Sequence, residues 1–177
     1  ERLVDAAKQL IYEQGFARTT LADIAEASGV PLGNVYYYFK TKDDLAAAVI
    51  AERRADIGAM LADCGCENDP RGCLVRLLEH LRERAGMIAE RGCPVGSLCQ
   101  ELGKTASPLT DQADELIRLQ LDWVTEQFTR LGVEDAATRA AAFLASVHGT
   151  FVTGQALKDA ALIHRQFSAL IDEVRAL

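Results

Sequence analysis

Residues 20–42 read TLADIAEASGVPLGNVYYYFKTK, and this stretch decides the fold of the N-terminal part of the chain. It begins with a capping box, in which Thr20 and Asp23 predict the first turn of a short helix. Gly29 lies in the tight turn that follows, where glycine tolerates a positive φ. Pro31 then stands where a second helix begins. The stretch therefore predicts two short helices joined by a glycine turn.

The second of these helices has an unusual outer surface. Val35 and Phe39, four residues apart, are its inward apolar pair, so we expect both in the core. The outward positions are held by Leu32, Gly33, Asn34, Tyr36, Tyr37 and Tyr38. Two helices around a glycine turn are typical of a helix-turn-helix unit, whose second helix enters the major groove of DNA.

The residue types on this surface suit DNA. The Asn34 amide has the two-pronged geometry that pairs with adenine, and Leu32 packs on a thymine methyl group. The phenolic hydroxyls donate to phosphate oxygens or base edges, and Lys40 and Lys42 neutralise phosphates. For Tyr38, the sequence favours packing inside the protein and contact with DNA equally. A protein-binding helix would more often carry Leu or Met at the positions that Gly33 and Asn34 hold.

The segment from Leu3 to about Ala51 resembles the DNA-binding domain of the TetR (AcrR-like) family of bacterial one-component transcriptional regulators. The resemblance rests on fixed positions at fixed spacing, which are Thr20-x-x-x-Ile24-Ala25, Ala27-x-Gly29-Val30 and Gly33-Asn34-Val35-Tyr36-Tyr37-Tyr38-Phe39-Lys40-Thr41-Lys42-x-x-Leu45. It implies a three-helix DNA-binding head on a helical, dimeric, ligand-binding body. A weaker similarity relates the segment from Gly92 to Leu98, with Glu101, to the LmrA/YxaF-like branch.

The resemblance and the residue types together give the candidate DNA contacts. They are Thr20, Leu32, Gly33, Asn34, Tyr36, Tyr37, Lys40 and Lys42. Thr20 is first a helix cap and only additionally a phosphate donor.

The rest of the chain also reads as helices. Thr41 and Asp44 form a second capping box, which opens a long helix that fades near Cys64 and Gly65. Further helices are expected from Asp69–Pro70 to Gly92, from about Val95 to Gly103, from Ser107–Pro108 to Gly132, and from Asp135 to the end with a break near Asp159. The expected fold class is all-α, with a helix-turn-helix head over residues 1–45 and an effector-binding and dimerisation body over residues 46–177.

The charge and composition exclude several classes of function. The 177 residues carry a net charge of −7, which argues against nonspecific coating of nucleic acid. Residues 1–50 hold five Lys and Arg against seven Asp and Glu, so DNA affinity would rest on few phosphate contacts and need both heads of a dimer. No apolar run is long enough to span a membrane, and an odd number of cysteines favours reduced thiols in a cytoplasmic protein.

The body is expected to hold an effector and a second copy of the chain. Candidate pocket residues are Leu81, Met87, Leu98, Trp123, Phe128, His148 and Phe151, with Gln155 as a further polar anchor. Few charges lie inside these helices, which favours an apolar or aromatic effector. Candidate interface residues are Ala145, Val152, Phe167, Leu170 and Val174. For both sets, an ordinary monomer core is the alternative interpretation.

A cysteine-based switch is an alternative to regulation by a bound effector. Cys64 and Cys66 are candidates for a redox or electrophile switch, on the expectation that both lie in a loop near basic helices. The plainer interpretation is that the cysteines are small hydrophobic residues. Their spacing does not match a zinc site, so neither metal nor cofactor is expected.

The best reading is a repressor that binds a palindromic operator in double-stranded DNA as a homodimer and is released by a small effector. No nucleophile-elbow, zinc-protease or complete phosphate-binding motif is present, so an enzyme is not expected. The alternatives are a cysteine-based sensor of the same fold and a helical protein-interaction adaptor without DNA binding.

Overall fold

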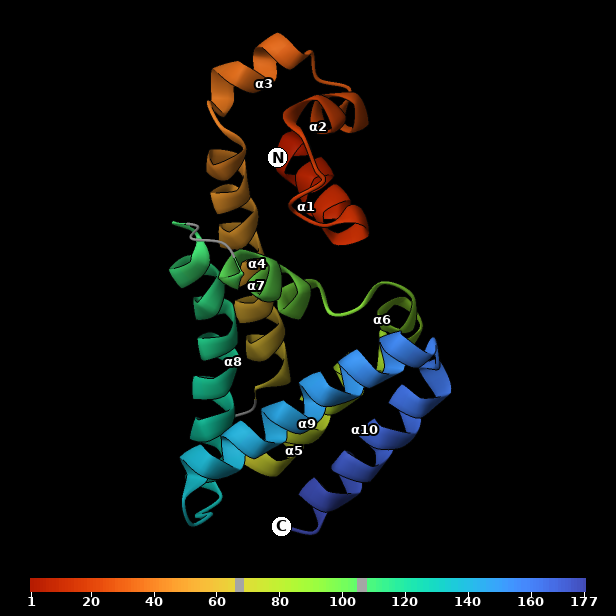
Figure 1. The fold of residues 1–177 in the computed structure, drawn as a ribbon. Coiled ribbons are helices and arrows are strands. Elements are labelled where there is room, and N and C mark those ends of the chain that lie inside the picture. The colour runs from red at the N-terminus through yellow and green to blue at the C-terminus, as the bar shows by residue number, and fades with distance from the viewer. Residues whose placement is uncertain (66–68, 105–107) are drawn as a thin grey trace. The chain divides into compact units, whose positions relative to one another are not determined.

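The computed structural model describes residues 1–65, 69–104 and 108–177, and all regular secondary structure within these ranges is helical (Figure 1). The helices are α1 (Arg2–Gln14), α2 (Leu21–Ser28), α3 (Leu32–Tyr38), α4 (Lys42–Cys64), α5 (Pro70–Glu83), α6 (Ala85–Arg91), α7 (Pro94–Gly103), α8 (Thr110–Arg130), α9 (Ala136–Leu157) and α10 (Ala160–Arg175). The all-α prediction is confirmed. Within the same ranges, no helix is both long and apolar enough to cross a bilayer.

Both predicted capping boxes are present. The Thr20 hydroxyl oxygen accepts from the Asp23 N–H at 3.1 Å, and the Asp23 carboxylate accepts from the Thr20 N–H at 2.8 Å. Thr41 and Asp44 make the same pair of bonds at 3.0 Å and 2.9 Å. The hydrogen bonds from Thr20 also hold the pKa of the Asp23 carboxyl below its ordinary value. These caps fix where α2 and α4 begin.

The helix predicted to run from Asp69 to Gly92 is in fact two helices. The chain leaves helical geometry at Arg84, whose backbone has φ −90° and ψ 5°. The break lets α6 turn its buried side, which includes Ala85 and Ile88, toward α9 and α10. No Gly or Pro stands at position 84, and the nearby Gly86 lies inside α6, so the sequence does not mark the position of this break. The helix predicted to begin at Ser107–Pro108 is α8, which begins at Thr110. Ser107 lies outside the described residues.

The described chain divides into two compact units that differ from the predicted split at residue 45. Unit 1 comprises residues 1–56 and 94–117, and unit 2 comprises residues 57–93 and 118–177. Unit 1 therefore includes most of α4 as well as α7, because α7 returns from later in the chain to pack on α1.

The core of unit 1 holds the three N-terminal helices together. Its buried residues are Leu3, Ala7, Ile24, Ala25, Val35, Leu45 and Val49. The Lys8 ammonium adds a polar tie between α1 and α4, at 2.9 Å from the Asp56 carboxylate and 3.6 Å from that of Glu52. The helix-turn-helix pair is thus mounted on α1 and α4.

The core of unit 2 joins α5, α6, α9 and α10. Its aromatic contacts include Phe151 with Phe167, at 5.5 Å between ring centres, and Phe128 with Phe143 at 5.9 Å. Gly154 of α9 lies directly against the Ile163 side chain of α10, where a Cβ would overlap that side chain. The close approach of the last two helices therefore depends on a glycine.

We expect Gly154→Ala to lower the free energy of unfolding by about 1–3 kcal/mol, because an added methyl group overpacks the contact with Ile163. Gly58→Ala is the matched control in α4, where a Cβ meets nothing within 4 Å. Removing a glycine from a helix interior should there raise stability by up to about 1 kcal/mol. Urea unfolding followed by circular dichroism measures both. Effects of the same sign would contradict the packing argument.

Candidate nucleic-acid interface

Helix α3 is held in place by one buried side chain. Val35 is fully buried, and Phe39, which ends the helix, is half-buried. The preceding turn is fixed by Gly29, whose φ of 65° and ψ of 23° are left-handed, and by the Val30 N–H, which donates to the Ala25 carbonyl at 3.1 Å. The predicted inward positions are confirmed, and the remaining side of α3 faces outward.

The outward side of α3, here called the α3 face, consists of exposed residues only. Its members are Leu32, Gly33, Asn34, Tyr36, Tyr37 and Tyr38. The exposed fractions of the three tyrosines are 48%, 75% and 66%. Tyr37 and Tyr38 contact each other edge to face, at 5.2 Å between ring centres. A Cβ at Gly33 would meet nothing within 4 Å, so a large partner has room to approach the backbone there.

The other candidate contacts lie outside α3, because Thr20 is the N-cap of α2 and Lys40 and Lys42 follow α3 in the chain. The cap of α2 uses the Thr20 hydroxyl oxygen as an acceptor, which leaves the role of its proton as a donor to phosphate a prediction. The Lys40 ammonium donates to the Tyr36 carbonyl at 3.0 Å. Lys42 is half-buried and donates to the carbonyls of Phe16 at 2.7 Å and Ala17 at 3.2 Å. Lys42 thus first joins the start of α4 to the turn after α1, a role that its position in the sequence motif did not reveal.

Glu101, noted above only for its place in the weaker family similarity, binds the turn between α1 and α2 that Lys42 also binds. The Glu101 carboxylate of α7 accepts from the Phe16 N–H at 2.5 Å. The two residues are far apart in the sequence, so only the fold brings them together.

The predicted effector residues do not share one unit. Leu98 is buried in unit 1, whereas the others lie in unit 2. Phe128 and Phe151 are core residues there, and Met87 is 40% exposed. Leu81 and Trp123 are half-buried.

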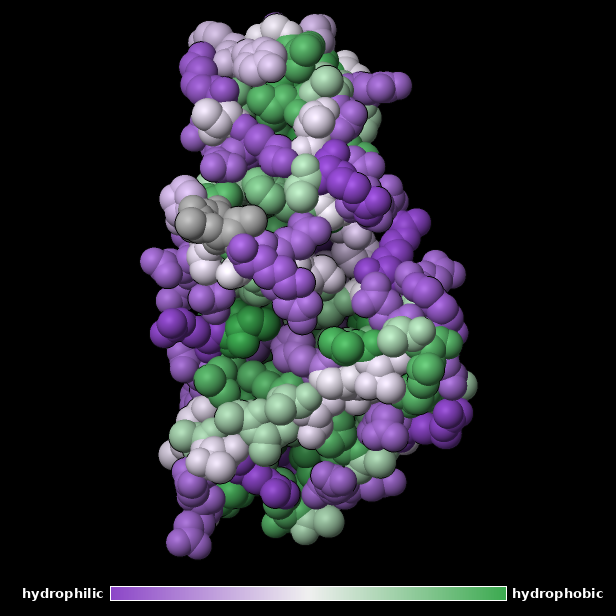
Figure 2. Space-filling view, viewed as in Figure 1, coloured by the Kyte–Doolittle hydropathy of each residue, from purple (hydrophilic) through white to green (hydrophobic). Residues whose placement is uncertain are grey.

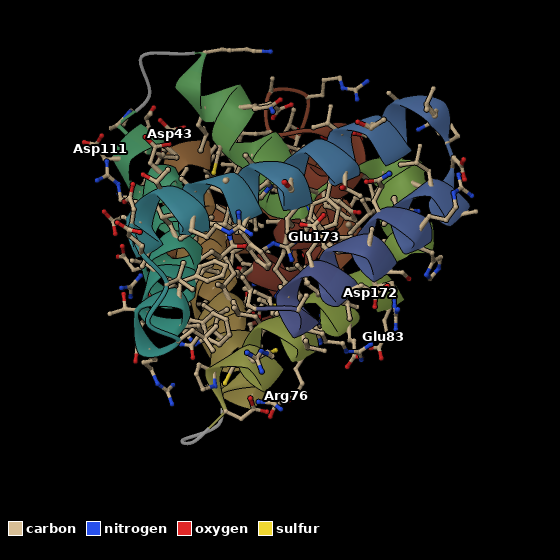
Figure 3. All side chains as sticks on the ribbon, turned by 90° about the horizontal axis from the view of Figure 1, so that it is seen from below. Asp43, Arg76, Glu83, Asp111, Asp172 and Glu173 are labelled. Atoms are coloured by element: carbon tan, nitrogen blue, oxygen red, sulfur yellow. The ribbon has the colours of Figure 1, made fainter. Side chains whose placement is uncertain are left out.

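A small hollow of about 80 Å³ in unit 2 includes only one of the predicted effector residues. It is lined by Phe128, Arg139, Ala142, Phe143, Ser146, Leu170, Glu173, Val174 and Leu177. Figure 3 shows Glu173 on α10, the helix that closes one side of this hollow. The hollow is too small for a drug-sized ligand.

His148, one of the predicted polar anchors, lies in unit 2. Its Nε2 is buried, with no hydrogen-bond partner in the part of the chain that the structure describes. Burial lowers the pKa of its imidazole below the ordinary value, so the ring is neutral at pH 7. Phe151 packs against the ring at 6.0 Å. A neutral ring with one unused nitrogen can accept a hydrogen bond from a ligand.

The predicted interface residues separate into two groups. Ala145 is exposed, Val152 is 57% exposed and Leu170 is half-buried, whereas Phe167 and Val174 are buried inside their own unit. The exposed positions of α9 from residue 141 onward, here called the α9 face, are Ala141, Ala142, Ala145, Ser146, Gly149, Val152, Thr153, Ala156 and Leu157. Figure 2 shows a largely white and green band where α9 crosses the view of Figure 1.

The exposed thiolate predicted at Cys64 is wrong. Cys64 is the last residue of α4 rather than a loop residue, and it is only 5% exposed. Burial raises the pKa of its thiol, although the nearby Arg76 guanidinium opposes the shift. Arg76 (Figure 3) donates to the Cys64 carbonyl at 3.0 Å and 2.8 Å. Cys66, the other redox candidate, lies outside the described residues.

Comparisons with known proteins agree with the helix-turn-helix assignment. The sequence profile described as bacterial regulatory proteins of the tetR family matches residues 3–49. The HTH-type transcriptional regulator TtgR of Pseudomonas putida is 39% identical over 79 residues, which are 44% of this chain and 38% of TtgR. The matched part thus spans well under half of that relative. LmrA of Bacillus subtilis is 28% identical over 144 residues, covering 80% of this chain and 77% of LmrA.

Solved structures share the fold over almost the whole chain. A TetR-family transcriptional regulator from Streptomyces coelicolor superposes with a TM-score of 0.87 at 22% identity, covering 98% of this chain and 92% of that protein. A TetR transcriptional regulator from Legionella pneumophila superposes with a TM-score of 0.85 at 20% identity, covering 98% and 95%.

We expect iodoacetamide to modify Cys64 at least about tenfold more slowly than the half-buried Cys93 in the native protein, because alkylation requires an accessible thiolate. Peptide mass spectrometry measures both rates, and fragment ions separate Cys64 from Cys66. The difference should disappear in urea. Equal rates in the native protein would show that Cys64 is accessible and would restore it as a switch candidate.

Proposed function

We propose that the chain is a member of the TetR family of bacterial regulatory proteins, whose profile matches residues 3–49, and that it is a ligand-responsive repressor that binds a palindromic DNA operator as a homodimer. The observation that carries the proposal is the α3 face. A helix of seven residues that buries only Val35 gains little from its own packing, so its exposed aromatic and amide groups are best explained by a partner.

The α3 face has the chemistry to read a major groove. Asn34 offers two-pronged pairing with adenine, and Leu32 offers apolar contact with a thymine methyl group. Tyr36 and Tyr37 present phenolic hydroxyls at a surface that carries no acidic side chain. Gly33 has no side chain, so the backbone of the first turn of α3 can approach the bases closely. In this assignment α2 crosses the phosphate backbone, with Thr20 at its first turn.

Phosphate contacts are few, which makes pairing of two heads necessary. Lys40 and Lys42 follow α3 in the chain, and the ammonium groups of both already bind backbone carbonyls. Each phosphate that a head neutralises adds to affinity and to its salt dependence. A dimer doubles these contacts on one duplex without any change in the head.

The α9 face supports the second copy. It joins small side chains, which allow close helix approach, to the exposed Val152 and Leu157. A self-complementary patch of this kind suits a two-fold interface, in which each copy supplies the same residues. We assign Ala145, Val152 and Leu170 to direct contact across it. Phe167 and Val174 lie beneath, and support that surface from the core.

Regulation is a shift between two arrangements of the dimer. DNA requires recognition helices about 34–36 Å apart, or a multiple of that spacing. An effector that binds unit 2 more tightly in an incompatible arrangement releases the operator. His148 is the proposed polar anchor, and its aromatic neighbour Phe151 favours an apolar or aromatic effector that donates one hydrogen bond.

We expect Asn34→Ala and Tyr37→Ala each to weaken binding to the preferred duplex by about 1–3 kcal/mol, because each removes a base-edge contact. The duplex is obtained by enrichment from a randomised pool on the wild-type protein. Lys40→Ala should instead weaken preferred and unrelated duplexes alike, and reduce the log–log salt slope by about one. Fluorescence anisotropy at several salt concentrations measures all three variants.

Gln9→Ala, at an exposed position on α1, is the control and should bind as the wild type does. If no duplex is enriched, or if Asn34→Ala and Tyr37→Ala bind normally, the α3 face is a protein-binding surface and the adaptor hypothesis replaces the repressor.

We expect Val152→Glu to raise the dimer dissociation constant at least about tenfold, because a two-fold interface brings two copies of the new charge into one apolar contact. Sedimentation velocity measures the dissociation constant. Ala62→Glu, at an exposed position of α4, introduces the same charge outside the α9 face and should leave the dimer intact. Monomeric wild-type protein would contradict the proposed interface.

A further inference from the structure

The turn between α1 and α2 is held by two side chains of opposite charge. The Phe16 N–H donates to the Glu101 carboxylate of α7 at 2.5 Å. The Phe16 carbonyl accepts from the Lys42 ammonium at 2.7 Å, and that ammonium also lies 4.2 Å from the centre of the Phe16 ring. Both polar groups of one residue are thus bound by ions that come from two other helices.

Gly15 makes this arrangement possible. Its φ of +89° is a backbone conformation that favours glycine, and a Cβ there would overlap the Glu101 carboxylate. The Gly15 carbonyl accepts from the hydroxyl of Thr19, which is fully buried, at 2.8 Å. The backbone on either side of Phe16 is therefore fixed, and the carboxylate fills a space that a side chain at position 15 would need.

This turn leads directly into the DNA-reading helices. Thr20 follows Thr19 and caps α2, and α2 packs on α3. Hydrogen bonds to charged groups are roughly twice as strong as neutral ones. Two of them at Phe16 therefore define the direction in which the chain enters α2, and through α2 the placement of the α3 face.

We propose that Glu101 is a positioning residue for DNA reading, which acts through the Phe16 N–H and does not touch DNA. The proposal rests on the proposed function. Glu101 belongs to α7, and the chain segment immediately before α7, up to Cys93, belongs to unit 2. A displacement of α7 acts on the Phe16 turn through this hydrogen bond, so the occupancy of the bond decides whether the α3 face is held in its reading position.

The test compares Glu101→Ala with Glu101→Gln, which keeps an acceptor oxygen but loses the charge. We expect the Phe16 amide of Glu101→Ala to exchange with deuterium at least about tenfold faster than in the wild type, because its acceptor is gone. Its affinity for the enriched duplex should fall about tenfold, while its affinity for an unrelated duplex stays within about twofold. Glu101→Gln should restore most of both properties.

Gln100→Ala, at the exposed position next to Glu101 in α7, is the matched control and should behave as the wild type in both measurements. If Glu101→Ala does not fold, the same comparison is made with Glu101→Gln alone, which should show smaller losses in the same direction.

Unchanged exchange at Phe16, or rapid exchange together with normal discrimination between the duplexes, would overturn the positioning role. Equal losses on both duplexes would also overturn it, because that result indicates general destabilisation. If the wild type enriches no duplex, the proposed function fails and the positioning role with it, whereas exchange at Phe16 still reports whether the hydrogen bond exists.

Discussion

The burial of Val35 is the constraint on which the N-terminal unit depends. It is the one buried residue of α3, and it inserts into the core that α1, α2 and α4 share. With Val35 fixed inside, helical geometry sends Asn34, Tyr36 and Tyr37 outward. The left-handed turn at Gly29 sets the angle between α2 and α3, and the cap at Thr20 sets where α2 begins. A single apolar anchor and two local turns thus present an aromatic surface that has no partner within the protomer.

Charged side chains bind backbone groups in unit 1 and fix positions that its small apolar core does not fix. The Lys42 ammonium and the Glu101 carboxylate bind the two polar groups of the Phe16 backbone. These contacts gain specificity more than stability, because they hold particular backbone atoms at particular places. Unit 2 is stabilised differently, by tilted and edge-to-face aromatic contacts and by the close contact of α9 and α10 at Gly154.

Local features of the fold were predictable from the sequence, and long-range features were not. Capping boxes, the glycine turn and the inward pair of α3 depend on residues within four positions of one another, and all are present. The break at Arg84 depends on which surface α6 must bury, and the division into units depends on α7 returning to α1. The tie at Lys42, the bond at Glu101 and the burial of Cys64 likewise arise from tertiary packing. A pattern of residue types carries no signal for any of these.

The most direct measurement of the central claim is photocrosslinking to an enriched duplex in which 5-iododeoxyuridine replaces thymidine in each half-site. Mass spectrometry of the crosslinked peptides then locates the protein atoms that lie against the bases. The account predicts crosslinks at Tyr36 or Tyr37 of α3, at equivalent positions in both half-sites. Crosslinks confined to residues outside α2 and α3, in a complex that still binds the duplex, would show that another surface reads the DNA and would contradict it.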